Sequence, residues 1–192
     1  SHGIHQKRTE GLHFVGGVFT NLSHDHLDYH PTFAEYRDVK KSFFDFLPKT
    51  AFALSNGDDK NGAVMLQNTA ATKRTYALKS YADYKAIILE NQLSGLLLKI
   101  NDNEVWVKLI GTFNAYNLLA IYGTAIELGL ESLEVLRLLS ELESVSGRFQ
   151  FIVSAQNITA IVDYAHTPDA LDNVLNTIND VRTQNEQLIT VV

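Results

Sequence analysis

The sequence predicts an α/β fold whose main sheet is mostly parallel. Two stretches carry this prediction, because each places an apolar, strand-like run before a polar turn and a segment of helical spacing. The first joins residues 13–22 to 33–47, and the second joins residues 51–54 to 63–71. Strands that alternate with helices are typical of parallel sheets, which hold ligands beyond the carboxyl ends of their strands. The residues after each run are therefore candidates for function.

The first unit has clear end signals. Its strand-like run contains the β-forming residues Val18 and Phe19. Thr32 and Glu35 have the spacing of a capping box, so we expect the helix to begin there. Pro48 ends it, because proline cannot continue a helix.

The second unit has a polar turn after its short strand. The turn contains Asp58 and Asp59, which we interpret as turn and helix-cap residues because carboxylates accept backbone N–H groups.

Residues 73–110 are expected to form a β-meander attached to the main sheet. Short β-like runs recur here, and a polar turn at 101–103 separates two of them. Trp106 is expected to pack rather than to bind a base. The runs are residues 75–78, 84–90, 95–100 and 105–110.

Two helices are expected after the meander. Gly111 ends a strand, Asn114 can cap the first helix, and Gly129 stops it after about Leu128. Residues 132–142 have the spacing of a second, amphipathic helix.

The last part of the chain has the β-α-β pattern that begins a Rossmann-like domain. We place the domain boundary near Phe149, which divides the chain into residues 1–149 and 150–192. A helix is expected from Pro168, a favoured first helical residue, to about Val181. Strands are expected as a pair at 151–154 and 159–162, and again at 188–192.

Composition excludes several classes of protein. The chain has 192 residues, 45% of them hydrophobic and 20% charged, which suffices for a sizeable core. A net charge of -6 argues against nucleic acid as a partner, and no apolar run is long enough to span a membrane. The absence of Cys excludes thiolate metal sites and suits a cytoplasmic protein. The chain starts at Ser1 without Met, so we expect a fragment of a longer protein.

The segment between the first strand and its helix is rich in metal-binding side chains. Residues 24–30 hold three His and two Asp. Mg²⁺ would take an imidazole together with oxygen donors and water, whereas Zn²⁺ would need three or four protein ligands. The same side chains also suit helix capping and loop hydrogen bonds. Residue types alone leave these interpretations open.

The motif Thr-Asn-Leu-Ser-His-Asp-His-Leu-Asp-Tyr-His at residues 20–30, with Glu-Tyr-Arg-Asp-Val-Lys at 35–40, resembles the central domain of the Mur ligases. The resemblance implies that His26 binds Mg²⁺ and that Lys40 is carbamylated and supports the metal site. A carbamate turns a cation into an oxygen ligand, which requires an amine with a depressed pKa. Without the resemblance, Lys40 would be an ordinary surface residue, as Lys41 beside it is expected to be.

Three further stretches resemble the same family. Near the start, Ser1, Gln6 and Arg8 match positions that hold the UDP-muramoyl dipeptide, and the fork of Arg suits carboxylate or phosphate. By sequence alone, the same stretch also fits a solvated helix end. The motifs Gly-x-Phe-Asn-x-x-Asn, Gly-Arg and Asp-Tyr-Ala-His-Thr-Pro-Asp imply contacts with ATP by Asn114, Asn117, Arg148, Asp163 and His166. An Asn amide can pair with a purine edge, and Arg supplies positive charge for phosphoryl oxygens.

The resemblance implies an ATP-dependent ligase of peptidoglycan synthesis that uses Mg²⁺ and acts as a monomer. Its partners would be UDP-N-acetylmuramoyl-L-alanyl-D-glutamate and a third amino acid, either meso-diaminopimelate or L-lysine, which the sequence does not distinguish. His26, Lys40 and Arg148 would have the catalytic roles, through an acyl phosphate. The chain has no phosphate-binding loop of the form G-x-x-x-x-G-K-[ST], so we expect it to be inactive alone.

Three alternatives stay open at the level of sequence. A folylpolyglutamate synthetase-like ligase shares the chemistry and architecture, although the Asp-Tyr-Ala-His-Thr-Pro-Asp run favours the Mur branch. A metal-dependent hydrolase could use the His-rich loop with a carbamylated Lys. The third alternative is a binding module without catalysis.

Overall fold

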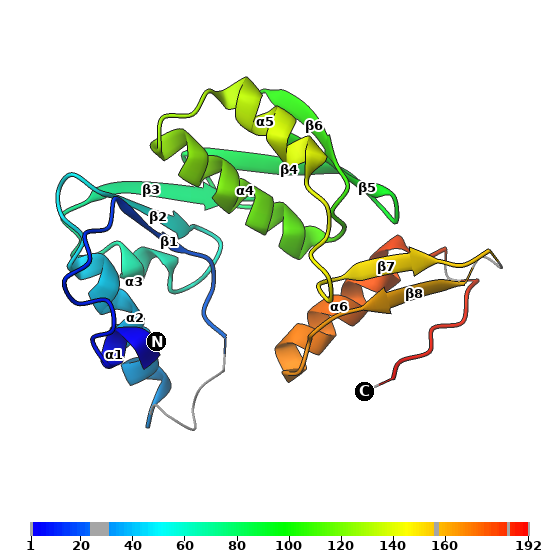
Figure 1. The fold of residues 1–192 in the computed structure, drawn as a ribbon, viewed down its shortest axis with the longest axis horizontal. Helices are drawn as coiled ribbons and strands as arrows, with labels where there is room; N and C mark the ends of the chain where they lie inside the picture. The colour runs from blue at the N-terminus through cyan, green and yellow to red at the C-terminus, as the bar shows by residue number, and fades with distance from the viewer. Residues whose placement is uncertain (1, 24–30, 156–157, 184, 192) are drawn as a thin grey trace.

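The computed structural model describes residues 2–23, 31–155, 158–183 and 185–191. A six-stranded sheet, with its strands in chain order from β1 to β6, forms the larger part (Figure 1). A two-stranded sheet of β7 and β8 lies in a separate part with one helix beside it (Figure 1). The chain passes from the first part to the second after α5.

Parallel pairing builds the first half of the large sheet. β1 (Gly16–Phe19), β2 (Phe52–Asn56) and β3 (Thr72–Ala77) pair in parallel, and β3 pairs in parallel with β4 (Tyr84–Gln92). β2 is buried along its whole length, as expected for a central strand covered on both faces. The predicted parallel sheet is therefore confirmed, although β1 is shorter than the run at 13–22.

Helices cover both faces of the parallel half. Phe52 and Leu54 of β2 pack into a core with α4 and α5, whereas Ala53 between them packs into a core with α2 and α3. This alternation follows from the period of two in a strand. The helices are α1 (His2–His5), α2 (Phe33–Asp45), α3 (Gly62–Met65), α4 (Thr112–Glu127) and α5 (Ser132–Glu141).

The antiparallel extension begins at β4. It continues through β5 (Gly95–Ile100) and β6 (Asn103–Val107), and Asn101 occupies the turn between them with φ 51°. The predicted meander is thus correct from β4 onward. Its first run belongs to β3, which is parallel to both of its neighbours. α3 provides the crossover from β2 to β3.

Three helix ends test the sequence signals. Thr32 caps α2 as predicted, since its Oγ1 accepts from the backbone N of Glu35 at 3.2 Å. α3 ends at Met65 rather than 71, because beyond it Thr69 bends the chain by accepting from the N of Ala71. The predicted cap at Asn114 is wrong, because the N-cap of α4 is Gly111.

α4 starts earlier than the sequence suggested. Its N-cap is Gly111, which has φ 91° and ψ 151°, and Thr112 is the first helical residue. Asn114 therefore lies inside the first turn, where its Nδ2 donates to the carbonyl of Ile110 at 2.8 Å. The predicted stop at Gly129 is confirmed, with φ 89° there.

The second part has a β-β-α order. β7 (Gln150–Val153) and β8 (Thr159–Val162) are antiparallel, and α6 (Pro168–Val181) follows with Thr167 as its cap. The strand predicted at 188–192 is wrong for the described residues 188–191, which belong to no strand. Their β-forming side chains are not enough, because a strand also needs a hydrogen-bonded neighbour. Within the described ranges, no helix combines the length and apolar character needed to cross a membrane.

Candidate functional site

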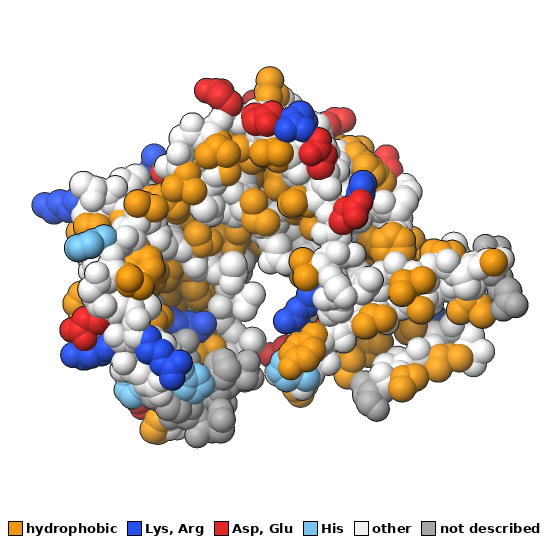
Figure 2. All heavy atoms as spheres, in the orientation of Figure 1, with side chains coloured by type: hydrophobic (Ala, Val, Ile, Leu, Met, Phe, Trp, Pro, Cys, Tyr) orange, Lys and Arg blue, Asp and Glu red, His pale blue; other side chains and the backbone are white. Residues whose placement is uncertain are grey.

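The carboxyl ends of β1 and β2 open into a cavity whose far wall is α6. Its volume is about 780 Å³, and its wall includes residues 20–23 after β1, the turn after β2 and one face of α6. Figure 2 shows a hollow between the part that contains α1 and α2 and the part that contains α6. Open α/β sheets bind ligands beyond the ends of their strands, so this cavity is the candidate site.

The described wall of the cavity is acidic. Lys79 is the one Lys or Arg among its described lining residues. Bound phosphates would therefore need cations from outside this wall. The carboxylates that line it are those of Asp58, Asp59, Asp169, Asp172 and Asp180.

Two side chains, one from the end of β2 and one from the turn after it, fix the exit of β1. Asn56 Nδ2 donates to the carbonyl of Thr20 at 2.9 Å, and Asp59 Oδ2 accepts from the N of Leu22 at 3.1 Å. The other oxygen of Asp59 accepts from the N of Asn61 at 2.7 Å. Asp59 is thus the predicted turn residue and also holds the chain that leads into residues 24–30.

Asp58 joins three segments of the chain and is not a helix cap. It accepts hydrogen bonds from the N of Leu78, Lys79 and Ser80 and from the hydroxyls of Ser80 and Tyr116, all at 2.7–2.8 Å. Burial opposes its ionisation, but these donors outweigh that effect and hold the pKa of Asp58 well below its usual range. The predicted cap was wrong because the bonds are made across the fold rather than within the turn.

Asn117 lines the cavity from the first turns of α4. Its Nδ2 donates to Asn114 Oδ1 at 3.3 Å, and Asn114 Nδ2 in turn donates to the carbonyl of Ile110. Asn114 therefore holds the helix start and orients its neighbour, whereas Asn117 is exposed to the site. The structure brings these two predicted residues together.

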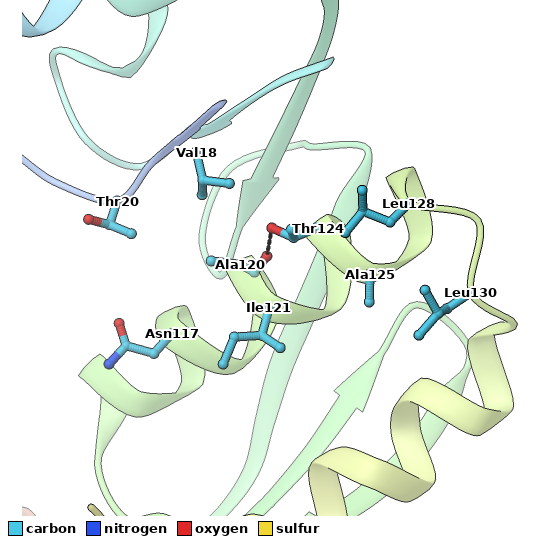
Figure 3. Close-up of a pocket in the computed structure, with 9 residues that line it drawn as sticks. All are labelled: Val18, Thr20, Asn117, Ala120, Ile121, Thr124, Ala125, Leu128 and Leu130. Carbon is cyan, nitrogen blue, oxygen red and sulfur yellow. Dashed lines mark hydrogen bonds between the residues drawn. The ribbon is translucent and has the colours of Figure 1, made fainter. Parts of the chain in front are cut away.

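An apolar cavity of about 540 Å³ lies between β1 and α4 (Figure 3). Val18, Ile121 and Leu128 contribute to its apolar wall, and Thr20 and Asn117 lie together at one end (Figure 3). Both of these polar residues also line the larger cavity. An apolar slot with an amide at its mouth suits the faces and the polar edge of a purine.

Lys40 lies in a third cavity, of about 330 Å³, between α2 and the exit of β1. Thr20 and Asn21 line the same cavity, and Lys40 Nζ lies 5.2 Å from the ring centre of Tyr36. Lys40 therefore faces the start of the segment for which a metal site is predicted.

His26 and Ser1 fall outside the described residues, as does the rest of the His-rich segment 24–30. In the part of the chain that the structure describes, no three side chains of His, Asp, Glu or Cys come together as a metal site. The roles of His26 and Lys40 stay predictions.

Gln6 and Arg8 lie in the turn that follows α1 and are exposed. The backbone N of Arg8 donates to the carbonyl of Gly3 at 2.8 Å, which closes the turn. Ile4 and Thr9, on either side of them, line the cavity that holds Lys40. The predicted substrate-binding segment thus lies next to the predicted metal-supporting residue.

Of the remaining predicted residues, Arg148 and His166 pack on Tyr164, and neither they nor Asp163 are among the described residues that line the large cavity. The Arg148 guanidinium lies 4.9 Å above the Tyr164 ring, and the His166 ring centre lies 5.0 Å from that of Tyr164. Asp163 accepts from the backbone N of Phe149 and of Ala165, both at 2.7 Å. The structure groups Arg148, Asp163 and His166 with one another and does not bring them to Asn117.

Sequence reasoning missed some residues of the site. Tyr116 received no role, and Asp58 received only a local one. The available signal was a pair of carboxylates directly after a buried strand, a position where side chains reach into the ligand cavity of an α/β fold.

The fold and the cavity define an open α/β protein with a polar site beyond its strand ends. Residues 1–125 match the family model of the Mur ligase middle domain, and residues 147–192 match that of the Mur ligase glutamate ligase domain. The chain belongs to the Mur ligase family.

Individual relatives carry the name UDP-N-acetylmuramoyl-L-alanyl-D-glutamate–2,6-diaminopimelate ligase. One from Parabacteroides distasonis and one from Phocaeicola vulgatus are each 58% identical over the whole chain. A solved structure of that name superimposes with a TM-score of 0.78 at 32% identity, over 94% of this chain and 38% of the other. The chain spans 40% of the length of these two curated relatives.

Proposed function

We propose that the full-length protein is an ATP-dependent amide ligase of peptidoglycan synthesis. It joins meso-diaminopimelate to the D-glutamate of UDP-N-acetylmuramoyl-L-alanyl-D-glutamate. The observation that carries the proposal is the cavity of about 780 Å³ in which Asn117 and the exits of β1 and β2 face α6. The names of the two relatives with 58% identity support diaminopimelate over L-lysine.

In this proposal residues 1–149 belong to the central, ATP-binding domain and residues 150–192 begin the C-terminal domain. The two family matches, which end at 125 and resume at 147, are consistent with this boundary. So is β7, which starts a separate sheet at Gln150.

The reaction has two steps. A carboxylate oxygen of the dipeptide attacks the γ-phosphorus of ATP, and the bond to ADP breaks as the new O–P bond forms. The amine of diaminopimelate then attacks the acyl carbon, phosphate leaves with the C–O electron pair, and the amine nitrogen releases a proton. The first step brings two anions together, and in the second the departing phosphate takes up negative charge, so the site needs fixed positive charge.

The side chains divide these tasks. Asn117, oriented by Asn114, pairs with the purine edge, and Arg148 supplies positive charge to the phosphates. Bound Mg²⁺ would screen the phosphate oxygens, with His26 as a ligand and Lys40 as a supporting carbamate. Further contacts are assigned to Asp163 and His166 with the nucleotide, and to Ser1, Gln6 and Arg8 with the UDP-linked substrate. Arg148, Asp163 and His166 are not among the described lining residues of the large cavity, so their roles in this proposal rest on the family motifs alone.

We also propose that the protein works as a monomer in the cytoplasm. The absence of Cys suits a reducing compartment, which is also where ATP is available as co-substrate. Size-exclusion chromatography with light scattering on the full-length protein tests the monomer, and a molar mass of two chains would contradict it.

The decisive experiment measures phosphate release and the ligated product in parallel. Full-length protein is given ATP, the UDP-muramoyl dipeptide and either meso-diaminopimelate or L-lysine, and the product is identified by mass spectrometry. We expect one phosphate per amide and product with diaminopimelate. If product forms with L-lysine but not with diaminopimelate, the proposed amino acid is wrong. If the protein hydrolyses its substrate without ATP, the proposal that it is a ligase is wrong.

A further inference from the structure

We propose that Asp58 is a positioning residue for nucleotide binding. In this inference, which rests on the proposed function, the Asp58 carboxylate holds the first turns of α4 against the turn after β2 and so keeps Asn117 at the mouth of the purine slot. Asp58 and Tyr116 both line the large cavity, but in this role they affect the nucleotide only through the position of Asn117.

A hydrogen bond from Tyr116 to Asp58 connects α4 to the turn after β2. Tyr116 precedes Asn117 on α4, and its hydroxyl donates to Asp58 Oδ2 at 2.8 Å across 58 positions of sequence. A charged acceptor makes such a bond stronger than a neutral pair would. The position of Asn117 relative to the strand ends therefore depends on this contact.

The carboxylate is itself held in place from the other side. Its oxygens accept from the backbone N of Leu78, Lys79 and Ser80, which follow β3. An Asp58 side chain fixed by these bonds cannot follow Tyr116 if the helix shifts, so it acts as an anchor. Asn at this position would turn an amide NH₂ toward several of these donors, and the anchor would be lost.

Two variants test the link at different strengths. Tyr116→Phe removes one hydrogen bond and keeps the ring, whereas Asp58→Asn disturbs the whole set. We expect the Kd for ATP, measured by calorimetry on the full-length protein, to rise about threefold in Tyr116→Phe and about tenfold or more in Asp58→Asn. The KM for ATP should rise in parallel, while kcat at saturating ATP changes less, because the reacting groups are untouched.

Asp83→Asn is the matched control. Asp83 lies in the β3–β4 connection, which also contains the backbone donors to Asp58. It accepts from the N and Oγ1 of Thr75, both at 2.8 Å, but does not line the large cavity. A merely structural role for Asp58 predicts that all these variants lower the melting temperature without changing the Kd for ATP. The positioning role predicts that Asp83→Asn shares only the loss of stability.

The outcomes separate the two proposals. If the wild type binds ATP and ligates while Tyr116→Phe and Asp58→Asn bind ATP equally well, the positioning role is wrong and the proposed function stands. If the wild type binds no ATP, both are wrong. Should Asp58→Asn fail to fold, an unchanged Kd in Tyr116→Phe would still overturn the positioning role.

Discussion

Lys40 and Lys41 are neighbours on α2 with different surroundings. Lys41 Nζ pairs with both oxygens of Asp45, at 2.6 and 2.7 Å, and its side chain is 12% exposed. Lys40 instead lines the cavity at the exit of β1. An amine that is already a paired cation is a poor candidate for carbamylation, because the reaction with CO₂ requires the neutral form. This ion pair makes Lys41 the poorer candidate, and the carbamate at Lys40 stays a prediction.

This contrast leads to a prediction for the full-length enzyme. Lys40→Ala should remove most of the ligase activity, whereas Lys41→Ala should lose stability and keep activity. Wild-type activity should fall in CO₂-free buffer and recover when bicarbonate is added, since carbamate formation is reversible. Phosphate release and circular dichroism measure the two effects. Equal loss of activity in both variants, with both folded, would argue against a special role for Lys40.

Asn114 and Asn117 form a second pair of close residues with separate tasks. Asn117→Ala should raise the KM for ATP about tenfold, the value of one good hydrogen bond, with little change in stability because the side chain is exposed. Asn114→Ala should cost about 1 kcal/mol of unfolding free energy, since the bond to Ile110 is lost. Urea denaturation and initial rates measure both. A purely structural pair would give loss of stability without a change in KM.

At the scale of elements, α4 and α6 meet at a glycine. A Cβ on Gly111 would lie 2.5 Å from Thr177 Cγ2, and Gly111 also has the positive φ that disfavours other residues. Thr177 is buried at 6% exposure, so it has little room to move. The start of the helix that carries Asn117 is therefore packed directly on the second part of the molecule.

We predict that Gly111→Ala destabilises the protein by roughly 1–3 kcal/mol through backbone strain and this clash. Adding Thr177→Ala should restore part of the loss, because it removes the clash but leaves the positive φ. Urea denaturation of the single and double variants measures the difference. If Thr177→Ala restores nothing, the packing between α4 and α6 does not contribute to the effect.

Local signals predicted most of the elements well. The Thr32 cap and the Pro168 start gave the beginnings of α2 and α6 because these signals act within one helical turn. The cap at Asn114 failed because Gly111, three residues earlier, leaves the strand by a positive φ that the sequence does not display. The strand at 188–192 failed because pairing depends on a neighbour distant in sequence.

The site was predictable only in part, for the same reason. Family motifs identified Asn117 and Lys40, and the structure places both beside the exit of β1, since Thr20 lines a cavity with each of them. The bond from Tyr116 to Asp58 spans 58 positions and has no signature in either local stretch. Long-range hydrogen bonds of this kind depend on the packing of α4 on the sheet, which periodicity does not specify.

At the scale of the whole molecule, side-chain and backbone contacts join the two parts beside an open cavity. Phe113 of α4 and Phe149 at the entry to β7 pack edge to face with ring centres 5.6 Å apart, and Asp163 accepts from the backbone of Phe149. Gly111 and Thr177 add the contact described above. Ligands bound in the cavity would touch both parts, so binding should stabilise the molecule as a whole.

The hydrogen bonds to Asp58 should make the stability of the whole fold depend on pH in the acid range. A carboxylate whose pKa is lowered by folding contributes stability above its unfolded pKa, about 3.9, and this contribution is lost as the pH falls toward the folded value. We therefore predict that the unfolding free energy of the wild type begins to fall at about pH 5 and keeps falling until the pH reaches the lowered pKa of folded Asp58. Asp58→Asn should be less stable at pH 7 and should show a shallower fall, because it has no such group to protonate.

Tyr116→Phe sharpens this prediction, because it keeps the Asp58 carboxylate and removes one of the donors that lower its pKa. Its acid response should lie between those of the wild type and Asp58→Asn. Urea denaturation at several pH values measures the three slopes. Since Asp58 joins the turn after β2, the loop after β3 and α4, its protonation should loosen all three together, and the unfolding transition should shift as one. Identical slopes in all three proteins would mean that other carboxylates govern the acid response.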